Sequence, residues 1–255
     1  MHLYVLKCCT AIGETMKYYA IVLAAGQGKR MGAGMNKQFL HIAGAPLIVH
    51  TLRFFEGDER CQEVILVINN ADRERMEQLV GTYRLKKVAS FVEGGSERQF
   101  SVYNGLQYVA DKIDDGIVVI HDGARPFLTK EIVDALYERA LQTDAATTAV
   151  RVKDTIKRVR SGVVIDTLDR ELLWAAHTPQ AFRLSLIMTA HQKAEEAGFI
   201  GTDDASLVEW LGHEVAVVEG DYFNIKLTTP EDLLFAEAIM RERKKCDDDK
   251  NRTRV

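Results

Sequence analysis

The sequence has few cysteines, and their arrangement excludes two classes of protein. Among its 255 residues are four cysteines, none in a Cys-x-x-Cys pair, and no histidine lies at the spacing of a zinc site. Neither a disulfide framework nor a zinc-stabilised fold is therefore expected. We predict free thiols in a reducing compartment. The cysteines are Cys8, Cys9, Cys61 and Cys246.

The sequence also lacks a strong excess of one charge and a long apolar run. A formal net charge of −4 is too small for a surface that binds nucleic acid, so any anion site must be local. No apolar run approaches the ~20 residues that span a bilayer. Lys7 and Glu14 interrupt the apolar N-terminal stretch, and no cleavage site follows it. We predict a cytoplasmic protein with no nucleic-acid or membrane partner.

What the sequence does contain is enough apolar material for a core. Hydrophobic residues make up 47% of the chain, which is ordinary for a globular protein. We predict one domain over residues 17–243. Residues 1–16 are predicted to be a disordered N-terminal extension, with Met16 as an alternative start, and the polar residues 244–255 a disordered tail.

Short apolar runs alternate with helical patterns along this domain. Residues 19–24, 64–68 and 117–120 are apolar on both faces, as strands covered on two sides must be. Between them, residues 47–55 place their apolar side chains on one helical face. The alternation predicts an α/β fold with a mostly parallel twisted sheet and helices on both faces. A capping box formed by Ser96 and Gln99 predicts a further helix over residues 97–108.

One stretch breaks this rhythm. Residues 149–168 carry strand-like residues on both sides of Ser161-Gly162, which predicts a protruding β-hairpin. An isolated two-stranded hairpin is barely stable in water, so it must pack on its own subunit or on a partner.

A glycine-rich, basic segment follows the first predicted strand. Residues 24–32 read AAGQGKRMG, and Lys37 follows closely. Ligands commonly bind at this end of an α/β sheet, and glycines let backbone N–H groups approach a phosphate. Lys29, Arg30 and Lys37 together suit a triphosphate. The alternative is a solvated loop that happens to be basic.

A dinucleotide-binding oxidoreductase is the alternative from another class. Gly26 and Gly28 fit the Gly-x-Gly-x-x-Gly pattern, but Met31 occupies its third position. The second predicted strand ends in Asn69-Asn70, where an NAD-type site needs an acid that binds the ribose. Both departures disfavour this alternative.

A second cluster, HDGARPF, follows the strand at 117–120. Asp122 comes directly after the strand and should lie at its carboxyl edge, where it could help to hold Mg²⁺ or another divalent cation together with substrate phosphates. Arg125 could reach an anionic substrate. Asp122 could instead form an Asx turn before Gly123. His121 is expected to be a packing residue.

Taken together, these clusters resemble the 2-C-methyl-D-erythritol 4-phosphate cytidylyltransferase family, in its Bacillus-type form, over about residues 18–241. The matching segments are LAAGQGKRM, NKQF, EGGSERQFSVYNGL, HDGARPF, VKDTIKR, TLDRELLWAAHTPQAF, GTDDAS and NIKLTTPEDL. The resemblance implies a Rossmann-like nucleotidyltransferase fold. It also implies a reaction of CTP with methylerythritol phosphate that gives 4-diphosphocytidyl-2-C-methyl-D-erythritol and pyrophosphate in non-mevalonate isoprenoid biosynthesis.

The resemblance also implies roles for single residues. Arg30 and Lys37 would stabilise the charge on the triphosphate, and Arg170 and Lys226 would aim the polyol phosphate at the α-phosphorus. Residues around the cytosine and ribose would be Ala24, Ala25, Gly26, Gly95, Ser96 and Ser101. Residues that bind methylerythritol phosphate would be Asp122, Arg125, Thr155, Arg170 and Lys226, with Thr178 as a further substrate-binding residue.

A homodimer is implied as well. In this family an arm from each subunit crosses to the other, which assigns that function to residues 149–168 and would bring Thr155 and Arg170 into the partner's site. Two positions depart from many relatives. Asn36 replaces a proline, which predicts a less rigid loop, and Ser96 replaces an aspartate, which predicts a weaker contact to ribose or base.

Two related functions are separated by particular residues. Ribitol-5-phosphate cytidylyltransferases tend to carry glycine in place of Ala25 and to lack the segment that contains Asp169-Arg170 and Leu173-Trp174, all of which this chain has. A regulatory nucleotide-binding protein without catalysis would be expected to lose Lys37, Arg170 or Lys226, and these are also present.

Overall fold

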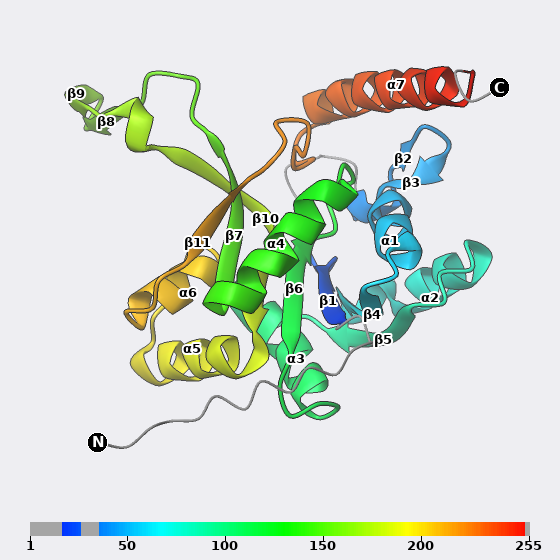
Figure 1. Cartoon of the computed structure of the whole chain (residues 1–255), viewed down its shortest axis with the longest axis horizontal. Helices are drawn as coiled ribbons and strands as arrows, with labels where there is room; N and C mark the ends of the chain where they lie inside the picture. Colours follow the sequence, from blue (N-terminus) through cyan, green and yellow to red (C-terminus); the bar gives the residue numbers. More distant parts are fainter. Residues whose placement is uncertain (1–16, 27–35, 253–255) are drawn as a thin grey trace.

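The computed structural model describes residues 17–26 and 36–252, and its centre is a seven-stranded sheet (Figure 1). The predicted extension at 1–16, residues 27–35 with Arg30, and residues 253–255 lie outside the described residues. The strand order is β11-β7-β10-β6-β1-β4-β5. The strands are β1 (Tyr18–Leu23), β4 (Cys61–Ile68), β5 (Val88–Glu93), β6 (Ile117–Asp122), β7 (Ala145–Arg151), β10 (Trp174–Arg183) and β11 (Ala216–Glu219).

The sheet is mostly parallel, as predicted. β1 pairs in parallel with β4 and β6, and β4 with β5, while β10 runs antiparallel between β6 and β7. In register, Leu23 lies opposite Val67 on one side and Asp122 on the other. The carboxyl ends of the three central strands therefore meet at one edge.

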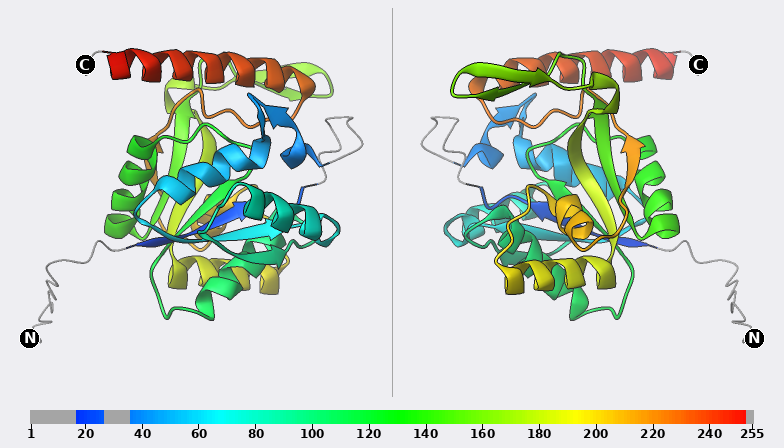
Figure 2. Two further views of the ribbon diagram at one scale, coloured as in Figure 1. Left: turned by 90° about the vertical axis from the view of Figure 1, so that its right-hand side faces the viewer. Right: turned by 90° about the vertical axis from the view of Figure 1, so that its left-hand side faces the viewer.

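Helices cover both faces of the sheet (Figure 2). Along β1, Ala20 and Val22 pack with α1, α2 and α4, whereas Ile21 packs with α3, α5 and α6. This alternation follows from the two-residue period of a strand, and it confirms the α/β prediction. The helices are α1 (Leu47–Gly57), α2 (Arg73–Thr82), α3 (Arg98–Ala110), α4 (Lys130–Thr143), α5 (Leu184–Ala197), α6 (Asp204–Trp210) and α7 (Pro230–Arg252).

The predicted hairpin is present and projects from the sheet beyond β7 and β10 (Figure 1). Its strands are β8 (Lys157–Arg160) and β9 (Val163–Thr167), which pair antiparallel. Ser161 and Gly162 form the turn with φ of 49° and 80°, the left-handed conformation that a tight hairpin turn requires. We call β8, β9 and their turn the arm.

Two local predictions were wrong. Ser96 and Gln99 form no capping box, because Glu97 is the N-cap of α3 and makes no side-chain capping bond. The Gln99 amide instead donates to the Phe199 carbonyl and accepts from the Gly201 N–H, which ties α3 to the loop before α6. This tertiary contact outweighs the local cap.

The tail is also different from the prediction. α7 continues through Arg252, whereas residues from 244 onward were expected to be disordered. Lys245 pairs with Glu242 three residues earlier at 2.7 Å, a spacing that supports a helix. No helix within 17–26 and 36–252 is long and apolar enough to cross a membrane.

Candidate active site

A cavity of about 640 Å³ opens at the carboxyl edge of β1, β4 and β6. That volume lies in the range of small-molecule sites, and the position is where α/β sheets bind ligands. Eight of the residues predicted from the sequence line it: Ala25, Gly26, Lys37, Gly95, Ser96, Ser101, Asp122 and Lys226. Segments far apart in the chain therefore meet in one cavity.

The wall on the predicted nucleotide side is built by close backbone approach. A Cβ on Gly94 would lie 2.4 Å from the Ala25 Cβ, so only glycine lets these two loops touch. The Gly94 N–H donates to the Ile68 carbonyl at 2.8 Å, and the Gly95 N–H donates to the Ser101 hydroxyl at 3.1 Å. The loop after β5 is thereby fixed against the end of β1.

Asn36 makes three side-chain hydrogen bonds, whereas residues 27–35 of the loop before it lie outside the described residues, so the less rigid loop stays a prediction. Its side-chain amide donates to the Asp72 carboxylate at 2.8 Å and to the Ala24 carbonyl at 3.3 Å. Its side-chain oxygen accepts from the Gln38 N–H at 3.1 Å and so caps the short helix η2 (Lys37–Phe39). Proline has no side-chain polar group and could make none of these bonds. Ala24 thus supports the cavity from behind through its carbonyl.

Two lysines approach the cavity from opposite ends of the chain. Lys37, at the start of η2, donates from Nζ to the Leu227 carbonyl at 2.8 Å. Lys226 belongs to the loop between β11 and α7, and its Nζ lies 2.7 Å from Asp122 Oδ2. Both ammonium groups therefore belong to one wall, and each can stabilise phosphate charge.

Asp122 is the centre of the charged groups. Besides Lys226, its carboxylate contacts Arg98 Nε at 3.4 Å and Arg125 Nε at 3.9 Å. Burial by itself would raise the pKa of Asp122, but the charges of Arg98 and Lys226 hold that pKa well below its usual range. Asp122 is therefore a carboxylate at any physiological pH.

The arrangement does not fit a divalent cation held by the protein alone. The Asp122 carboxylate already pairs with three cationic side chains, which would compete with and repel a metal ion. Within the described ranges, no three histidine, cysteine, aspartate or glutamate side chains gather in a way that could hold a metal. The prediction of Asp122 as a direct metal ligand is not supported by this geometry.

Arg125 and Thr178 lie behind Asp122 and are not part of the cavity wall. Arg125 donates from Nη1 to the Asn224 carbonyl at 2.7 Å, and the Asn224 amide donates to the Thr178 carbonyl at 2.8 Å. The Thr178 hydroxyl accepts from the Asp122 N–H at 3.0 Å. Through these bonds, Arg125 and Thr178 orient Asp122 and the loop that carries Lys226.

His121 is a packing residue, as expected. Its ring is buried, lies 5.9 Å from the Phe55 ring and contacts the Arg125 carbonyl at 3.0 Å through Nε2. Burial lowers the pKa of His121 to about 4. The ring is therefore neutral at neutral pH.

Two predicted residues are not at this cavity. Thr155 and Arg170 are exposed on the segments that flank the arm, and Arg170 donates to the Lys153 carbonyl at 2.8 Å. Within a single subunit, Thr155 and Arg170 therefore do not line the cavity that contains Asp122.

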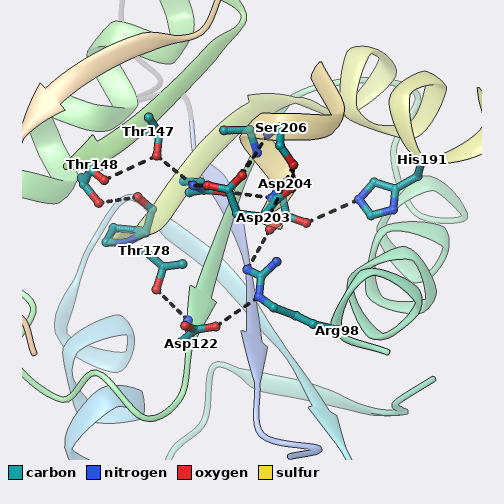
Figure 3. A network of polar contacts seen from close by, with 12 residues as sticks. Arg98, Asp122, Thr147, Thr148, Thr178, His191, Asp203, Asp204 and Ser206 are labelled. Atoms are coloured by element: carbon teal, nitrogen blue, oxygen red, sulfur yellow. Dashed lines mark hydrogen bonds and ion pairs between the residues drawn. The ribbon is translucent and has the colours of Figure 1, made fainter. Parts of the chain in front are cut away.

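Arg98 and Asp204 were missed as site residues. Arg98 is the first residue of α3 and lines the cavity between Asp122 and Asp204 (Figure 3). Both residues lie in segments that matched the family, EGGSERQFSVYNGL and GTDDAS, but neither spacing nor composition indicates that they meet.

Comparison with known proteins identifies the family. The family model for 2-C-methyl-D-erythritol 4-phosphate cytidylyltransferase matches residues 18–242. The chain belongs to this family. A cytidylyltransferase of that name from Geobacillus kaustophilus is 61% identical over 228 residues, which are 89% of this chain and 99% of the relative. The dinucleotide-binding alternative finds no support in these matches.

Solved cytidylyltransferases share the fold. The 4-diphosphocytidyl-2C-methyl-D-erythritol synthase of Anaerococcus prevotii superposes with a TM-score of 0.77 at 30% identity, over 89% of this chain and 96% of its own. The cytidylyltransferase of Thermus thermophilus gives 0.71 at 32% identity, over 87% and 98%. The match spans nearly the whole of these proteins, so the family fold is complete in this chain.

Proposed function

We propose that this chain transfers the cytidylyl group of CTP to 2-C-methyl-D-erythritol 4-phosphate and releases pyrophosphate, a step of non-mevalonate isoprenoid biosynthesis. The observation that carries the proposal is a cavity in which Lys37, Lys226 and Asp122 meet within the fold of this family. A cytoplasmic location belongs to the same proposal, since Cys61 is a free thiol and CTP is a soluble intracellular nucleotide.

The reaction needs positive charge more than it needs a base. A phosphate oxygen of methylerythritol phosphate attacks the α-phosphorus in line, and the bond from that phosphorus to the bridging β-oxygen breaks as pyrophosphate leaves. The nucleophile is already anionic at neutral pH, so no side chain has to remove a proton. The barrier is repulsion between two anions, which fixed cations and correct positioning reduce.

The two lysines divide this work. Lys37 is expected to stabilise the triphosphate, together with Arg30, to which the resemblance gives the same role. Lys226 is expected to hold the phosphate of the polyol. Because Asp122 contacts Lys226 Nζ at 2.7 Å, the ammonium is oriented before substrate arrives. Such preorganisation avoids a reorganisation cost during the reaction.

We propose that Mg²⁺ enters with CTP and is held mainly by the nucleotide phosphates. Mg²⁺ commonly keeps several waters and takes only one or two protein carboxylates, and Asp122 is already paired with cations. Calorimetric titration of Mg²⁺ into the nucleotide-free enzyme should show no binding in the micromolar range. Micromolar binding that Asp122→Asn abolishes would contradict this proposal.

A homodimer through residues 149–168 is proposed on the exposure of the arm. Its apolar side chains Val159, Val163, Val164 and Ile165 are each more than half exposed. Exposed apolar side chains that cluster on one element indicate an interaction site. In such a dimer, the segments that flank the arm would deliver Thr155 and Arg170 to the partner's cavity.

Subunit mixing tests the arm directly. Lys37→Ala damages the cavity and Arg170→Ala damages the segment that flanks the arm, so each homodimer should be nearly inactive. In a mixed dimer, an intact arm meets an intact cavity once, and random exchange should restore about a quarter of the wild-type activity. No recovery after verified exchange would place Arg170 in its own subunit's site.

The function itself is tested by identifying the product. Wild-type enzyme with CTP, Mg²⁺ and methylerythritol phosphate should give a nucleotide with the mass of 4-diphosphocytidyl-2-C-methyl-D-erythritol and release pyrophosphate. Ribitol 5-phosphate serves as the competing substrate, and a fluorescence titration with NADH serves as the control for dinucleotide binding. Faster turnover of ribitol 5-phosphate would reject the proposed substrate.

A further inference from the structure

Arg98 lies between two carboxylates that come from different elements. Its Nε is 3.4 Å from Asp122 Oδ1 at the end of β6, and its Nη2 is 2.8 Å from Asp204 Oδ2 at the start of α6 (Figure 3). The Arg98 side chain is 29% exposed and faces the cavity, whereas that of Asp204 is 1% exposed. Asp204 thus holds Arg98 from behind.

Besides Arg98, the Asp204 carboxylate has one further polar side chain close to it, and the backbone of Asp204 is tied to β10. His191 Nε2 from α5 lies 3.5 Å from its Oδ1, and the His191 ring stacks on Tyr103 of α3 at 5.7 Å. The Asp204 N–H donates to the Gln180 side chain at 3.2 Å. Burial alone would raise the pKa of Asp204, but Arg98 and His191 hold that pKa below its ordinary value, so the group is charged.

A fully buried carboxylate is a poor way to stabilise a fold. Desolvating its charge costs free energy that a single ion pair often fails to recover, and apolar residues of similar size frequently stabilise more. The carboxylate is explained better by orientation. A guanidinium is planar and carries its donors in a rigid fork. When Asp204 binds one edge of the Arg98 guanidinium, it therefore also sets the direction of the edge that contacts Asp122.

We propose that Asp204 fixes the Arg98 guanidinium, and that Arg98 is a positioning residue that orients the Asp122 carboxylate toward Lys226. With Oδ1 held by Arg98, Oδ2 remains available to Lys226 at 2.7 Å. This inference rests on the proposed function, in which Lys226 binds the phosphate of the polyol. Arg98 contributes little net charge to the cavity, because two carboxylates share it.

The test is Asp204→Asn, which keeps the shape of the side chain and removes its charge. We expect kcat/KM for methylerythritol phosphate to fall about 10- to 100-fold, as for other supporting contacts around a site. The KM for CTP should change by less than about 3-fold, because that substrate keeps its own contacts.

Ser206→Ala is the matched structural control. Ser206 completes the capping box of α6 with Asp203, and its hydroxyl bonds to the Asp203 backbone. This variant should lower the melting temperature and leave both kinetic constants near wild type. If Asp204→Asn loses activity only in proportion to a similar loss of melting temperature, Asp204 has a structural role and the proposal fails.

A second variant keeps the test independent of Asp204. Arg98→Lys retains a positive charge but cannot reach two carboxylates in one fixed plane. It should lose activity as Asp204→Asn does, and the double variant should be no worse than either single one, because both break the same contact. Wild-type kinetics in Arg98→Lys, or additive losses, would overturn the proposal.

The failure of this inference is distinct from failure of the proposed function. If wild type forms no cytidylyl product from methylerythritol phosphate, the function is wrong. If wild type forms it and Asp204→Asn does so with unchanged constants, only the role of Arg98 and Asp204 is wrong. A raised KM for CTP in Arg98→Lys alone would make Arg98 a direct nucleotide contact instead.

Discussion

In the cavity, charged side chains are buried against one another, whereas on the arm they surround exposed apolar side chains. Asp122 pairs with Lys226, Arg98 and Arg125 within 4 Å, and its side chain is 9% exposed. On the arm, Arg158 pairs with Asp166 in a much more exposed setting, and Val163 is 68% exposed. The rest of the chain covers the charged side chains of the cavity, whereas it leaves the apolar side chains of the arm exposed.

The two regions also differ in how they are anchored. The cavity is fixed by the sheet edge, while the arm is anchored only at its base. There Arg151 lies 4.5 Å from the Trp174 ring and Lys153 lies 3.5 Å from the Tyr222 ring. Neither of these two cation–ring contacts involves a residue of β8 or β9. If a second copy of the chain completes the active site, the enzyme needs both a preorganised cavity and an arm that projects from the subunit.

Loss of Lys37 should have the largest effect. We expect Lys37→Ala to lower kcat about 10²- to 10³-fold, as loss of a preorganised donor does elsewhere, while CTP binding weakens far less. Steady-state kinetics with a binding titration for CTP measures both. Lys193→Ala, at an exposed position on α5 paired with Glu196, is the control and should be silent. A near-normal kcat in Lys37→Ala would remove this lysine from the mechanism.

Loss of Arg170 should affect the polyol phosphate selectively. A charge-assisted hydrogen bond contributes ~1.5–3 kcal/mol, so Arg170→Ala should lower kcat/KM for methylerythritol phosphate about 10- to 100-fold. The melting temperature of the variant should stay at the wild-type value, because the Arg170 side chain is exposed and donates to an exposed carbonyl, that of Lys153. Unchanged KM and kcat for the polyol phosphate would refute the assignment.

A charge on the arm should weaken self-association. Val163→Asp would place a carboxylate in the proposed apolar contact, and we expect the dimer dissociation constant to rise about 10-fold or more. Sedimentation velocity over a concentration series measures it. Ile200→Asp, at an apolar position outside the arm that is also more than half exposed, should leave association unchanged. Equal association in both variants would separate the arm from the dimer contact.

The charge of Asp122 should make a smaller contribution to the free energy of unfolding, and this contribution should be lost in acid. Its folded pKa lies below the ordinary value of 3.8, so the unfolded chain takes up the proton first as the pH falls. The stabilisation is therefore present above about pH 4 and declines below it. Urea unfolding between pH 7 and pH 2.5 should show a shallower acid loss in Asp122→Asn than in wild type. Parallel curves would mean that the ion pairs do not stabilise the fold.

The period of the apolar side chains and the turn residues predicted most of the fold. The runs at 64–68 and 117–120 became central parallel strands, and Ser161-Gly162 became the hairpin turn, because these signals are local. Local signals failed where tertiary contacts compete with them. The Gln99 side chain bonds to the loop at 199–201 and forms no cap, and α7 continues past residue 243, the predicted end of the domain.

The site divides in the same way. Lys37, Asp122 and Lys226 could be picked out because each follows a strand end or precedes a helix in a distinctive segment. Asn36 could not be interpreted, since its partners Ala24 and Asp72 lie 12 and 36 residues away. Arg98 and Asp204 are more than 100 residues apart, and a charged residue at a helix start is ordinary in any sequence.

The sequence by itself determined the alternation of strands and helices, the segment that forms the arm and the family to which the chain belongs. Those properties depend on side-chain period, turn conformation and long matching motifs, all of which lie along the chain. Only the tertiary structure decided that Asp122 is saturated by three cations and that Asp204 stands behind Arg98. Such pairings depend on distances across the packed sheet edge, where burial strengthens each charge interaction.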